Sequence, residues 1–473
     1  MKRKKTHLLV LGGGPGGYTA AFYAADRGLE VTLVDDLPRL GGVCMNHGCI
    51  PSKALLQTTA YLEAMDKLKD RGIHFDKPRL NLRDLNEWKD QVVVKLGRGL
   101  ESLAKSRSVK VVRGRGTFED VNLLRVEQEE GQQYYEFEQA IIATGSRPAL
   151  PGPMDIGNPR VLTSREALEV ESVPERMLVV GGGYIGLELG TVYARLGSEV
   201  TVVEATAGLL PGVDRDLVRP LGKAMESIFN EVRLETSVEH LSTSGEQVEA
   251  AFSKDDSSDS GLFDRVLVAI GRQPNTAALG LEDAGVGTDG KGFIKVDEQG
   301  RTGNGQVWAI GDCCRNPMLA HKAAKEARVA VRSILGERAS AADFRVPAIV
   351  FTDPAVAWAG LTEAEAAEQD IRFETASFSW KASGRALSHG RTDGLTKLVV
   401  DPESKRLLGV GVCGYGAAEL IAEGTLALEM GASVRDLAEL IHPHPTLSET
   451  YQEAAEQFYG TATHQVARKA DQP

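Results

Sequence analysis

The chain has 473 residues, of which 42% are hydrophobic, and its formal net charge at pH 7 is −12. This length suggests about three or four domains, and the acidic balance gives no electrostatic reason to expect nucleic-acid binding. We expect a soluble cytoplasmic protein with no membrane segment, because no apolar run could cross a bilayer and the basic residues 2–5 lack the body of a targeting peptide.

A glycine-rich turn opens the chain. A strand is expected over 7–11 and a helix over 18–27, followed by a second strand over 30–34 that ends on Asp35. Between the first strand and the helix, Gly12, Gly14 and Gly17 fit the dinucleotide fingerprint, in which they make the turn, admit the pyrophosphate and allow close packing. An acid such as Asp35 accepts a hydrogen bond from a ribose hydroxyl. We therefore predict a dinucleotide-binding unit; an ordinary glycine turn is the alternative.

Two cysteines, Cys44 and Cys49, stand five positions apart just before a run of helix formers that follows Pro51. The positive end of a helix favours a thiolate over a thiol. A structural disulfide is disfavoured in a five-cysteine chain without a secretion signal, and a zinc site would need a second pair of ligands nearby. We predict a redox-active pair that stores two electrons, and no metal site.

The segment over 58–106 is helical and charged, and we expect a pair of helices over the first core. Strands are then predicted at four places, and a buried strand over 140–148 contains the small-residue turn Ala143-Thr144-Gly145. Such a turn lets the backbone approach a ligand closely. The four shorter strands are expected over 109–112, 114–118, 123–127 and 134–138.

The fingerprint occurs twice. A strand over 177–180 runs into Gly181, Gly183 and Gly186, and a helix over 187–196 and a strand over 199–203 lead to Glu204. Two fingerprints imply two dinucleotides, one tightly held and one exchangeable. A carboxylate at Glu204 accepts from a free 2′-hydroxyl and repels a 2′-phosphate, and no Arg or Lys stands in 205–208, so NAD is favoured over NADP.

The third block contains a buried strand that ends in Gly311-Asp312, a pair suited to hold a polyol hydroxyl. Cys313 and Cys314 follow directly, and we interpret them as bystanders because adjacent cysteines bridge only with strain. Cys413 is expected to be a small core residue. The acidic stretch over 254–260 is interpreted as a solvated hairpin tip.

The last part predicts antiparallel strands over 348–351, 396–400 and 408–413, with helices over 362–368 and 417–430. Near its end stand His442, His444 and Glu449. Thr446 and Glu449 fit a capping box, with Thr446 as N-cap. The other interpretation is a histidine oriented by a carboxylate, which thiol–disulfide chemistry needs as its acid/base. The stretch alone leaves both open.

The stretch from Gly41 to Lys53, the two fingerprints and the turns at 143–145 and 311–312 together resemble the flavin-dependent pyridine nucleotide–disulfide oxidoreductases. Within that family the C-terminal part is similar to the dihydrolipoamide dehydrogenase branch, through residues 358–363, 384–386, 419–423 and 442–449. The resemblance implies an α/β chain with two Rossmann-like domains and a C-terminal α+β dimerisation domain. The implied boundaries are 1–149 (FAD-binding), 150–273 (NAD-binding), 274–343 (a central domain completing the FAD site) and 344–473 (dimer interface).

The implied reaction is the oxidation of protein-bound dihydrolipoamide to lipoamide with reduction of NAD⁺. Cys49 would lie against the flavin ring and Cys44 would exchange with substrate, while His444, oriented by Glu449, would serve the partner subunit of a homodimer. Lys53 would lie near the flavin, paired with Glu188. The residues implied for FAD are Gly12, Gly14, Gly17, Asp35, Lys53, Gly116, Thr144, Gly145, Asp312 and Ala320. Those implied for the NAD side are Gly181, Gly183, Gly186, Glu188, Glu204, Val238 and Gly271.

Three features depart from the family pattern. Pro443 stands between the two histidines, the cysteine pair follows Asp312, and Tyr184 resembles the flavin-covering tyrosine of glutathione reductases. The alternatives are a related NAD(P)H-dependent flavin disulfide reductase with another dithiol substrate, or a non-catalytic nucleotide-binding protein. The lipoyl-bearing partner would be a separate protein, of a 2-oxoacid dehydrogenase complex or of glycine cleavage.

Overall fold

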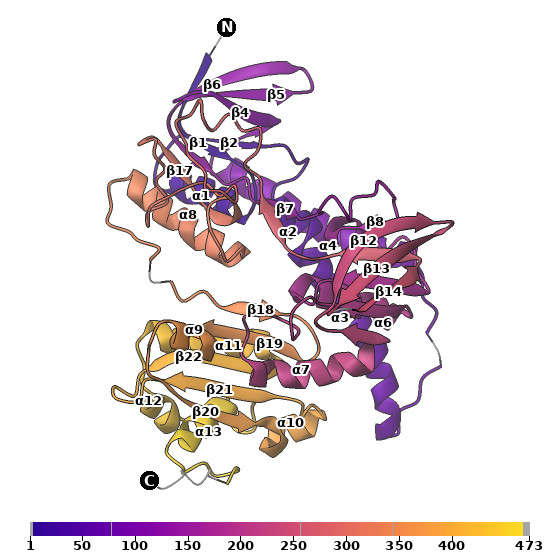
Figure 1. Cartoon of the computed structure of the whole chain (residues 1–473). Helices are drawn as coiled ribbons and strands as arrows, with labels where there is room; N and C mark the ends of the chain where they lie inside the picture. Colours follow the sequence, from indigo (N-terminus) through magenta and orange to yellow (C-terminus); the bar gives the residue numbers. More distant parts are fainter. Residues whose placement is uncertain (1–2, 77, 256, 343, 467–473) are drawn as a thin grey trace.

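The computed structural model describes residues 3–76, 78–255, 257–342 and 344–466, and Figure 1 shows three units. The first is built on a seven-stranded sheet in the order β3-β2-β1-β6-β5-β4, with β17 paired to β6. Its elements are β1 (Arg3–Leu11), α1 (Pro15–Asp26), β2 (Val31–Asp35), α2 (Gly42–His47), α3 (Cys49–Lys67), the 3₁₀ turn η1 (Leu68–Arg71), α4 (Leu82–Ser106), β3 (Lys110–Arg113), β4 (Arg115–Asp120), β5 (Leu123–Gln128), β6 (Gly131–Ile142), β7 (Ser146–Pro148), β17 (Val307–Ala309), the 3₁₀ turn η2 (Gly311–Cys313) and α8 (Ala320–Ile334).

The second half of the central strand β1, residues 8–11, is buried on both faces. Leu8 and Val10 pack with α1 and α8, while Leu9 and Leu11 pack with the strands β4, β5 and β6 on the other face. Alternate side chains of a strand point to opposite faces, so covering both faces explains why the second half of this strand, residues 8–11, is apolar without alternation. It therefore ends, at Leu11, with its C-terminal edge directed at the glycine turn.

The second unit repeats this plan on a five-stranded sheet in the order β11-β10-β9-β15-β8 and adds the antiparallel sheet β12-β13-β14. The second unit is linked to the first by the pair of strands β7 and β16. Its elements are β8 (Val161–Leu162), α5 (Ser164–Ala167), β9 (Arg176–Val180), α6 (Tyr184–Leu196), β10 (Glu199–Val203), α7 (Arg215–Ile228), β11 (Glu231–Arg233), β12 (Ser237–Ser244), β13 (Gln247–Lys254), β14 (Ser257–Phe263), β15 (Arg265–Val268) and β16 (Arg272–Pro274).

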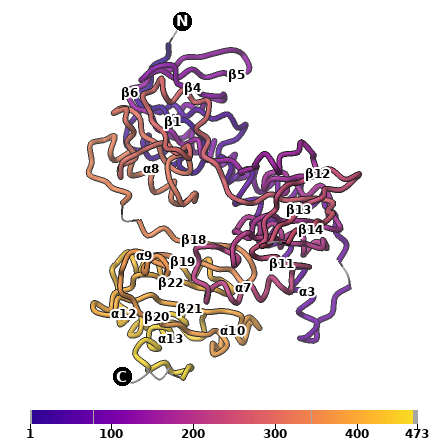
Figure 2. Tube along the Cα trace, in the orientation of Figure 1, coloured from indigo at the N-terminus to yellow at the C-terminus, as the bar shows by residue number. Residues whose placement is uncertain are grey.

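The third unit is an antiparallel sheet in the order β18-β19-β22-β21-β20, with α11 packed on β22 and β19 and α13 on β20. Figure 2 shows how the trace first returns from the second unit to the first, where α8 lies, before it enters this part. Its elements are β18 (Ala348–Val350), β19 (Ala355–Gly360), α9 (Glu363–Glu368), β20 (Glu374–Ser379), the 3₁₀ turn η3 (Trp380–Ala382), α10 (Gly384–His389), β21 (Leu395–Val400), β22 (Leu407–Gly414), α11 (Ala417–Glu429), α12 (Val434–Glu439) and α13 (Glu449–Phe458).

Two expectations from the sequence are wrong in detail. The strands predicted over 134–138 and from 140 are one strand, β6, which pairs with β1 along residues 134–142 and so has no reason to break. The helices α3 and α4 do not lie only over the first core, because Leu55, Leu56 and Leu85 join the core of the second unit. The end of α4, at Leu100 and Ala104, packs into the first.

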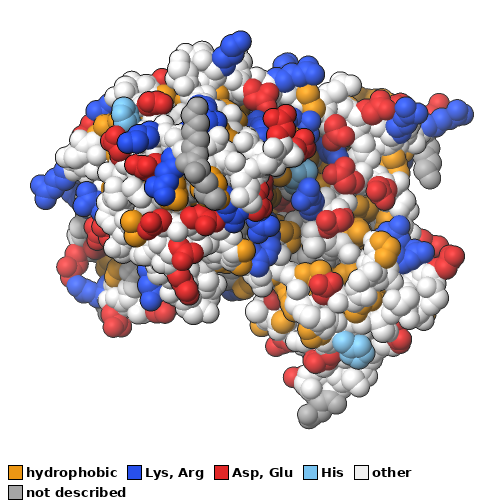
Figure 3. Space-filling view, turned by 90° about the horizontal axis from the view of Figure 1, so that it is seen from above, with side chains coloured by type: hydrophobic (Ala, Val, Ile, Leu, Met, Phe, Trp, Pro, Cys, Tyr) orange, Lys and Arg blue, Asp and Glu red, His pale blue; other side chains and the backbone are white. Residues whose placement is uncertain are grey.

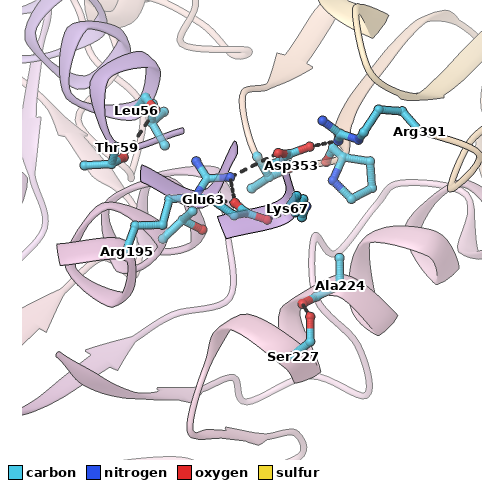
Figure 4. Close-up of polar contacts among 12 residues, drawn as sticks. Leu56, Thr59, Glu63, Lys67, Arg195, Ala224, Ser227, Asp353 and Arg391 are labelled. Carbon is cyan, nitrogen blue, oxygen red and sulfur yellow. Dashed lines mark hydrogen bonds and ion pairs between the residues drawn. The ribbon is translucent and has the colours of Figure 1, made fainter. Parts of the chain in front are cut away.

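Charged side chains of α3, α6 and the third unit form ion pairs that join the three units. Arg195 of α6 donates to Glu63 of α3 at 2.7 Å and to Asp353 at 3.1 Å, and Asp353 also pairs with Arg391 in the third unit (Figure 4). The Arg195 side chain is 6% exposed, so these contacts are shielded from water. On the face seen in Figure 3, basic and acidic side chains are interspersed. In the described residues no helix has the length and apolarity to span a membrane.

A second set of ion pairs joins α7 to the third unit. The ammonium of Lys397, which is 1% exposed, lies 2.9 Å from Asp214 and 2.8 Å from Asp216 and also contacts Glu363. A buried charge is tolerated only when it is paired, and removing one partner leaves the other uncompensated.

We predict that Lys397→Met lowers the free energy of unfolding by about 3–5 kcal/mol, because the carboxylates lose their cation. The matched control is Lys69→Met, whose side chain is 52% exposed and pairs only with Asp66; exposed pairs contribute less than about 1 kcal/mol. Urea unfolding followed by fluorescence compares the two. Equal midpoints for both variants would contradict the prediction.

Candidate active site

The first fingerprint is held by contacts between backbones. A Cβ on Gly12, whose φ is +107°, would lie 2.3 Å from the Ala143 carbonyl oxygen, and one on Gly17 would lie 1.7 Å from the Gly12 oxygen. A Cβ on Gly14, the N-cap of α1, would only reach ordinary contact distance, 3.8 Å from the Cα of Gly42. The turn is therefore tightly packed against backbone at Gly12 and Gly17, while the N–H groups at the start of α1 remain available for an anion.

The second fingerprint repeats this geometry. Gly181 has φ +109°, and its Cβ would lie 2.5 Å from the Ala269 oxygen; a Cβ on Gly186 would lie 2.1 Å from the Gly181 oxygen. Gly183 is the N-cap of α6 and has open space around it. Val238 is buried beside this unit on β12, and Gly271 follows β15 with φ +132°. The two units thus present equivalent helix ends, each with room for a dinucleotide phosphate.

The acid at the end of each second strand braces its own glycine turn. Asp35 accepts from the Gly13 N–H at 3.0 Å, and Glu204 accepts from Gly182 and Thr206, both at 2.8 Å. Burial raises the pKa of Asp35 to about 6, against the hydrogen bond from Gly13. Each acid is therefore fixed at the carboxyl edge of its sheet, where ribose hydroxyls of a dinucleotide bind.

A cavity of about 710 Å³ runs from the first glycine turn to the redox cysteines. Of the residues implied for FAD, only Gly17 lies outside its wall, because it packs beneath the turn. Gly181, Gly183, Gly186, Glu204, Val238 and Gly271 also lie outside it, whereas Tyr184 and Glu188 of α6 line it. The residues implied for FAD that line the wall are Gly12, Gly14, Asp35, Lys53, Gly116, Thr144, Gly145, Asp312 and Ala320.

The cysteines lie on two successive helices. Cys44 is in the short helix α2, and Cys49 is the first residue of α3, with Gly48 between the helices. Both are free thiols on the cavity wall, and their Sγ atoms are 2.7 Å apart. A hydrogen bond from the Cys44 thiol lowers the pKa of Cys49 to about 7; burial opposes this and the Lys53 charge assists it. The same bond, with burial, raises the pKa of Cys44.

The ion pair implied between Lys53 and Glu188 is present, with Nζ 2.7 Å from Oε2. The Glu188 side chain is 4% exposed, and its other oxygen accepts from the Phe351 N–H at 3.0 Å. The Lys53 ammonium also lies 4.6 Å from the centre of the Phe351 ring. Lys53 is four residues after Cys49 on α3, so its charge lies on the same helix face as the thiol.

His444 and Glu449 form a hydrogen-bonded pair, with Nδ1 2.8 Å from Oε1. The capping box predicted here is only half present: the Thr446 N–H donates to Glu449 at 2.7 Å, but the Thr446 hydroxyl bonds Pro443 and Ser448, and α13 begins at Glu449. The Glu449 carboxylate is thus shared between backbone and imidazole. His444 is 77% exposed and lies outside the wall of the cavity of its own chain.

The sequence reasoning missed Ser146 and Arg272. The Ser146 hydroxyl donates to Asp312 at 2.6 Å, and Arg272 donates to that hydroxyl at 2.7 Å. Both residues line the cavity. Each directly follows a glycine predicted to bind a cofactor, Gly145 or Gly271, and this position is the feature of the sequence that could have indicated them. Cys313 and Cys314 are buried directly after Asp312, and Cys413 is buried in β22 as a core residue.

Two family models match the chain: the pyridine nucleotide-disulphide oxidoreductase model over residues 6–327 and the dimerisation domain of the same family over residues 346–455. The chain belongs to the pyridine nucleotide-disulphide oxidoreductase family. The mixed α/β fold, with two dinucleotide units and a dimerisation domain, agrees with the fold expected from the sequence.

Within the family, the chain is similar to proteins named dihydrolipoyl dehydrogenase. The protein from Vibrio cholerae is 42% identical over 463 residues, covering 98% of this chain and 97% of that protein. The one from Haloferax volcanii is 42% identical over 469 residues, covering 98% of each. Among solved structures, LpdA from Mycobacterium tuberculosis superposes with a TM-score of 0.89 at 26% identity, covering 96% of this chain and 99% of that one. The flavoprotein disulfide reductase RclA from Escherichia coli gives 0.86 at 28%, with the same coverage.

We predict that the reduced enzyme is alkylated by iodoacetamide at Cys49 with a midpoint near pH 7, because the thiolate reacts and its pKa is lowered to about 7. Cys44→Ala removes the donated hydrogen bond, which is the main cause, and should move the midpoint upward. Peptide mass spectrometry across pH measures it, with the exposed-lysine variant Lys69→Met as the unchanged control. A midpoint that stays the same in Cys44→Ala would show that the bond has no such effect.

Proposed function

We propose that the chain is a dihydrolipoyl dehydrogenase that oxidises dihydrolipoamide and reduces NAD⁺. The observation that carries this proposal is the pair Cys44–Cys49 on the wall of a dinucleotide cavity, with Lys53 and Glu188 beside it. Full-length relatives of that name at 42% identity support the same substrate. FAD, when bound in the cavity, supplies the two-electron relay between the dithiol and NAD⁺.

The cavity fits FAD in size and in chemistry. Its volume of about 710 Å³ is within the range of about 300–1,000 Å³ of cofactor pockets, and it begins at the open N-cap of α1, which suits a pyrophosphate. Asp35 would accept from a ribose hydroxyl. Asp312, oriented by Ser146 and Arg272, would hold the sugar-like chain. Gly116, Thr144, Gly145 and Ala320 would bring backbone close to the cofactor.

The second fingerprint would hold NAD. The N-cap Gly183 would admit the pyrophosphate, and Glu204 would accept from the adenine ribose. The arginine beside this turn, Arg215, donates to the carbonyls of Leu209, Leu210 and Val213, so its guanidinium is already engaged and is not free for a 2′-phosphate. These contacts favour NAD over NADP.

The residues divide the thiol chemistry between them. A dihydrolipoamide thiol gives its proton to His444 at Nε2, because Nδ1 is held by Glu449. The new thiolate attacks Cys44 of the oxidised pair, the Cys44–Cys49 bond breaks, and Cys49 leaves as a thiolate. The second substrate thiol then attacks the mixed disulfide, releasing lipoamide and returning a thiol at Cys44.

The imidazole would come from a second copy of the chain. His444 is 77% exposed and lies outside the cavity of its own chain, and the dimerisation domain spans residues 346–455. A homodimer in which each His444 serves the partner's cysteines accounts for both facts. We further propose a cytoplasmic location, where free thiols are maintained, and a lipoyl group carried by a separate protein of a 2-oxoacid dehydrogenase complex or of glycine cleavage.

Tyr184 favours a second candidate, a flavin disulfide reductase with another dithiol substrate. It lines the cavity next to Arg272, and burial raises its pKa to about 12, so it stays a neutral phenol. Profiling of disulfide substrates with NADH separates the two candidates, since the first requires lipoamide to be reduced fastest.

We predict that anaerobic addition of dihydrolipoamide to the FAD-loaded enzyme produces a long-wavelength absorption band from a thiolate next to the oxidised flavin. Cys49→Ser removes the thiolate and should abolish the band, while Cys413→Ser, a core position away from the cavity, should keep it. If wild type shows no band, the role proposed for Cys49 is wrong.

We also predict complementation between two inactive variants. In a hybrid of one Cys44→Ser subunit and one His444→Gln subunit, one site lacks both groups and the other has both. The hybrid should therefore have about half of wild-type activity per dimer, a share that follows from the proposed sharing of residues. Tagged hybrids purified by two affinity steps allow the assay. An inactive hybrid would place His444 and Cys44 of one site in the same chain.

A further inference from the structure

The loop between α12 and α13 carries a second imidazole to which no role has been given. His442 lies two residues before His444, and its side chain is 3% exposed although the loop lies at the surface. Its Nε2 is 2.7 Å from Oε1 of Glu423, which belongs to α11. Its Nδ1 is 3.3 Å from the carbonyl oxygen of Leu440. Both ring nitrogens therefore face oxygen atoms.

These partners decide the protonation of the ring. A carbonyl and a carboxylate oxygen only accept hydrogen bonds, and a neutral imidazole has one donor and one acceptor nitrogen. In the neutral form one ring lone pair would face an oxygen lone pair. Only the imidazolium satisfies both partners. The pKa of His442 is raised accordingly, first by the bond to Glu423, while burial opposes the charge.

The charged and polar groups around the ring support this state. Glu423 faces it from α11, the Gln452 side chain on α13 also raises the pKa of His442, and Glu449 of α13 interacts with its charge. On its own loop the neighbouring titratable group is His444. Burial disfavours ionisation of Glu449, but the Thr446 N–H, His444 and His442 together lower its pKa, so Glu449 is ionised when it holds His444.

We propose that His442 is a positioning residue whose imidazolium, paired with Glu423, ties the loop to α11 so that His444 is held with Nε2 outward. The loop is then anchored on two sides, by Glu423 at His442 and by Glu449 at His444 and Thr446. The inference rests on the proposed function, in which His444 is the acid/base for dihydrolipoamide.

The pair also implies a direction with pH. Because the folded-state pKa of His442 is raised, the stabilisation from the ion pair is complete at low pH and is lost as the pH rises through that pKa. The anchor at Glu423 should therefore fail on the alkaline side, and dihydrolipoamide oxidation should decline there with it.

His442→Gln and Glu423→Gln each remove one charge and keep similar size. Each should lower kcat for dihydrolipoamide oxidation by about 10- to 100-fold, the effect of misplacing a reacting group by about 1 Å. The NADH-dependent reduction of ferricyanide, which does not need His444, should be unchanged. The matched control is His464→Gln. His464 is 61% exposed and pairs with Glu453 of α13, so this variant also breaks a histidine–glutamate pair but should leave both activities intact.

NMR of the holoenzyme with ¹³C- and ¹⁵N-labelled histidine gives a readout independent of activity. The signal lost in His442→Gln should titrate with a midpoint above the ordinary histidine pKa of about 6.5, and Glu423→Gln should lower that midpoint. A titration midpoint at or below about 6.5, or full lipoamide activity in both variants, would overturn the inference. Full activity in His444→Gln would instead overturn the proposed function, so the two failures are distinguishable.

Discussion

One buried carboxylate, that of Glu188, ties together the parts on which the active site depends. It lies on α6 of the second unit, accepts from Lys53 on the redox helix and accepts from the Phe351 N–H at the start of the third unit. A buried carboxylate needs such partners, because its desolvation is otherwise unfavourable by several kcal/mol. The positions of α3, α6 and the third unit are thus coupled at the cavity wall. Lys53 in turn brings a positive charge to the face of α3 that carries Cys49.

The two dinucleotide units share a backbone geometry but differ in enclosure. In both, a glycine Cβ would collide with a carbonyl oxygen and an acid accepts from the turn. The first turn opens into a cavity whose wall is completed by the redox helices and by residues 310–323. The second turn lies outside that wall. This difference agrees with one dinucleotide that is retained and one that is exchanged.

Most of what could be predicted from the sequence followed from short-range sequence patterns. The glycine positions and the strand-terminal acids Asp35 and Glu204 were predictable because each role depends on a few neighbouring residues. The spacing of Thr446 and Glu449 fits two motifs equally, and only the fold shows that the carboxylate is shared with His444. The packing of Leu55 and Leu85 on the second unit was not predictable, because an amphipathic face does not say what covers it. Ser146 lies 166 positions from its partner Asp312, and Arg272 lies 126 positions from its partner Ser146, so no local pattern reveals these contacts.

The order in which the cavity wall occurs along the chain has a consequence for biosynthesis. The wall includes residues from Leu11 to Ala323, so about two thirds of the polypeptide must emerge before the pocket can close. Domains generally fold as they leave the ribosome, and the first unit would expose its unfinished sheet edge, beside β6, until β17 arrives to pair with it. The flavin pocket is consequently complete only after about two thirds of the chain has been made, and until then the edge of β6 stays unpaired.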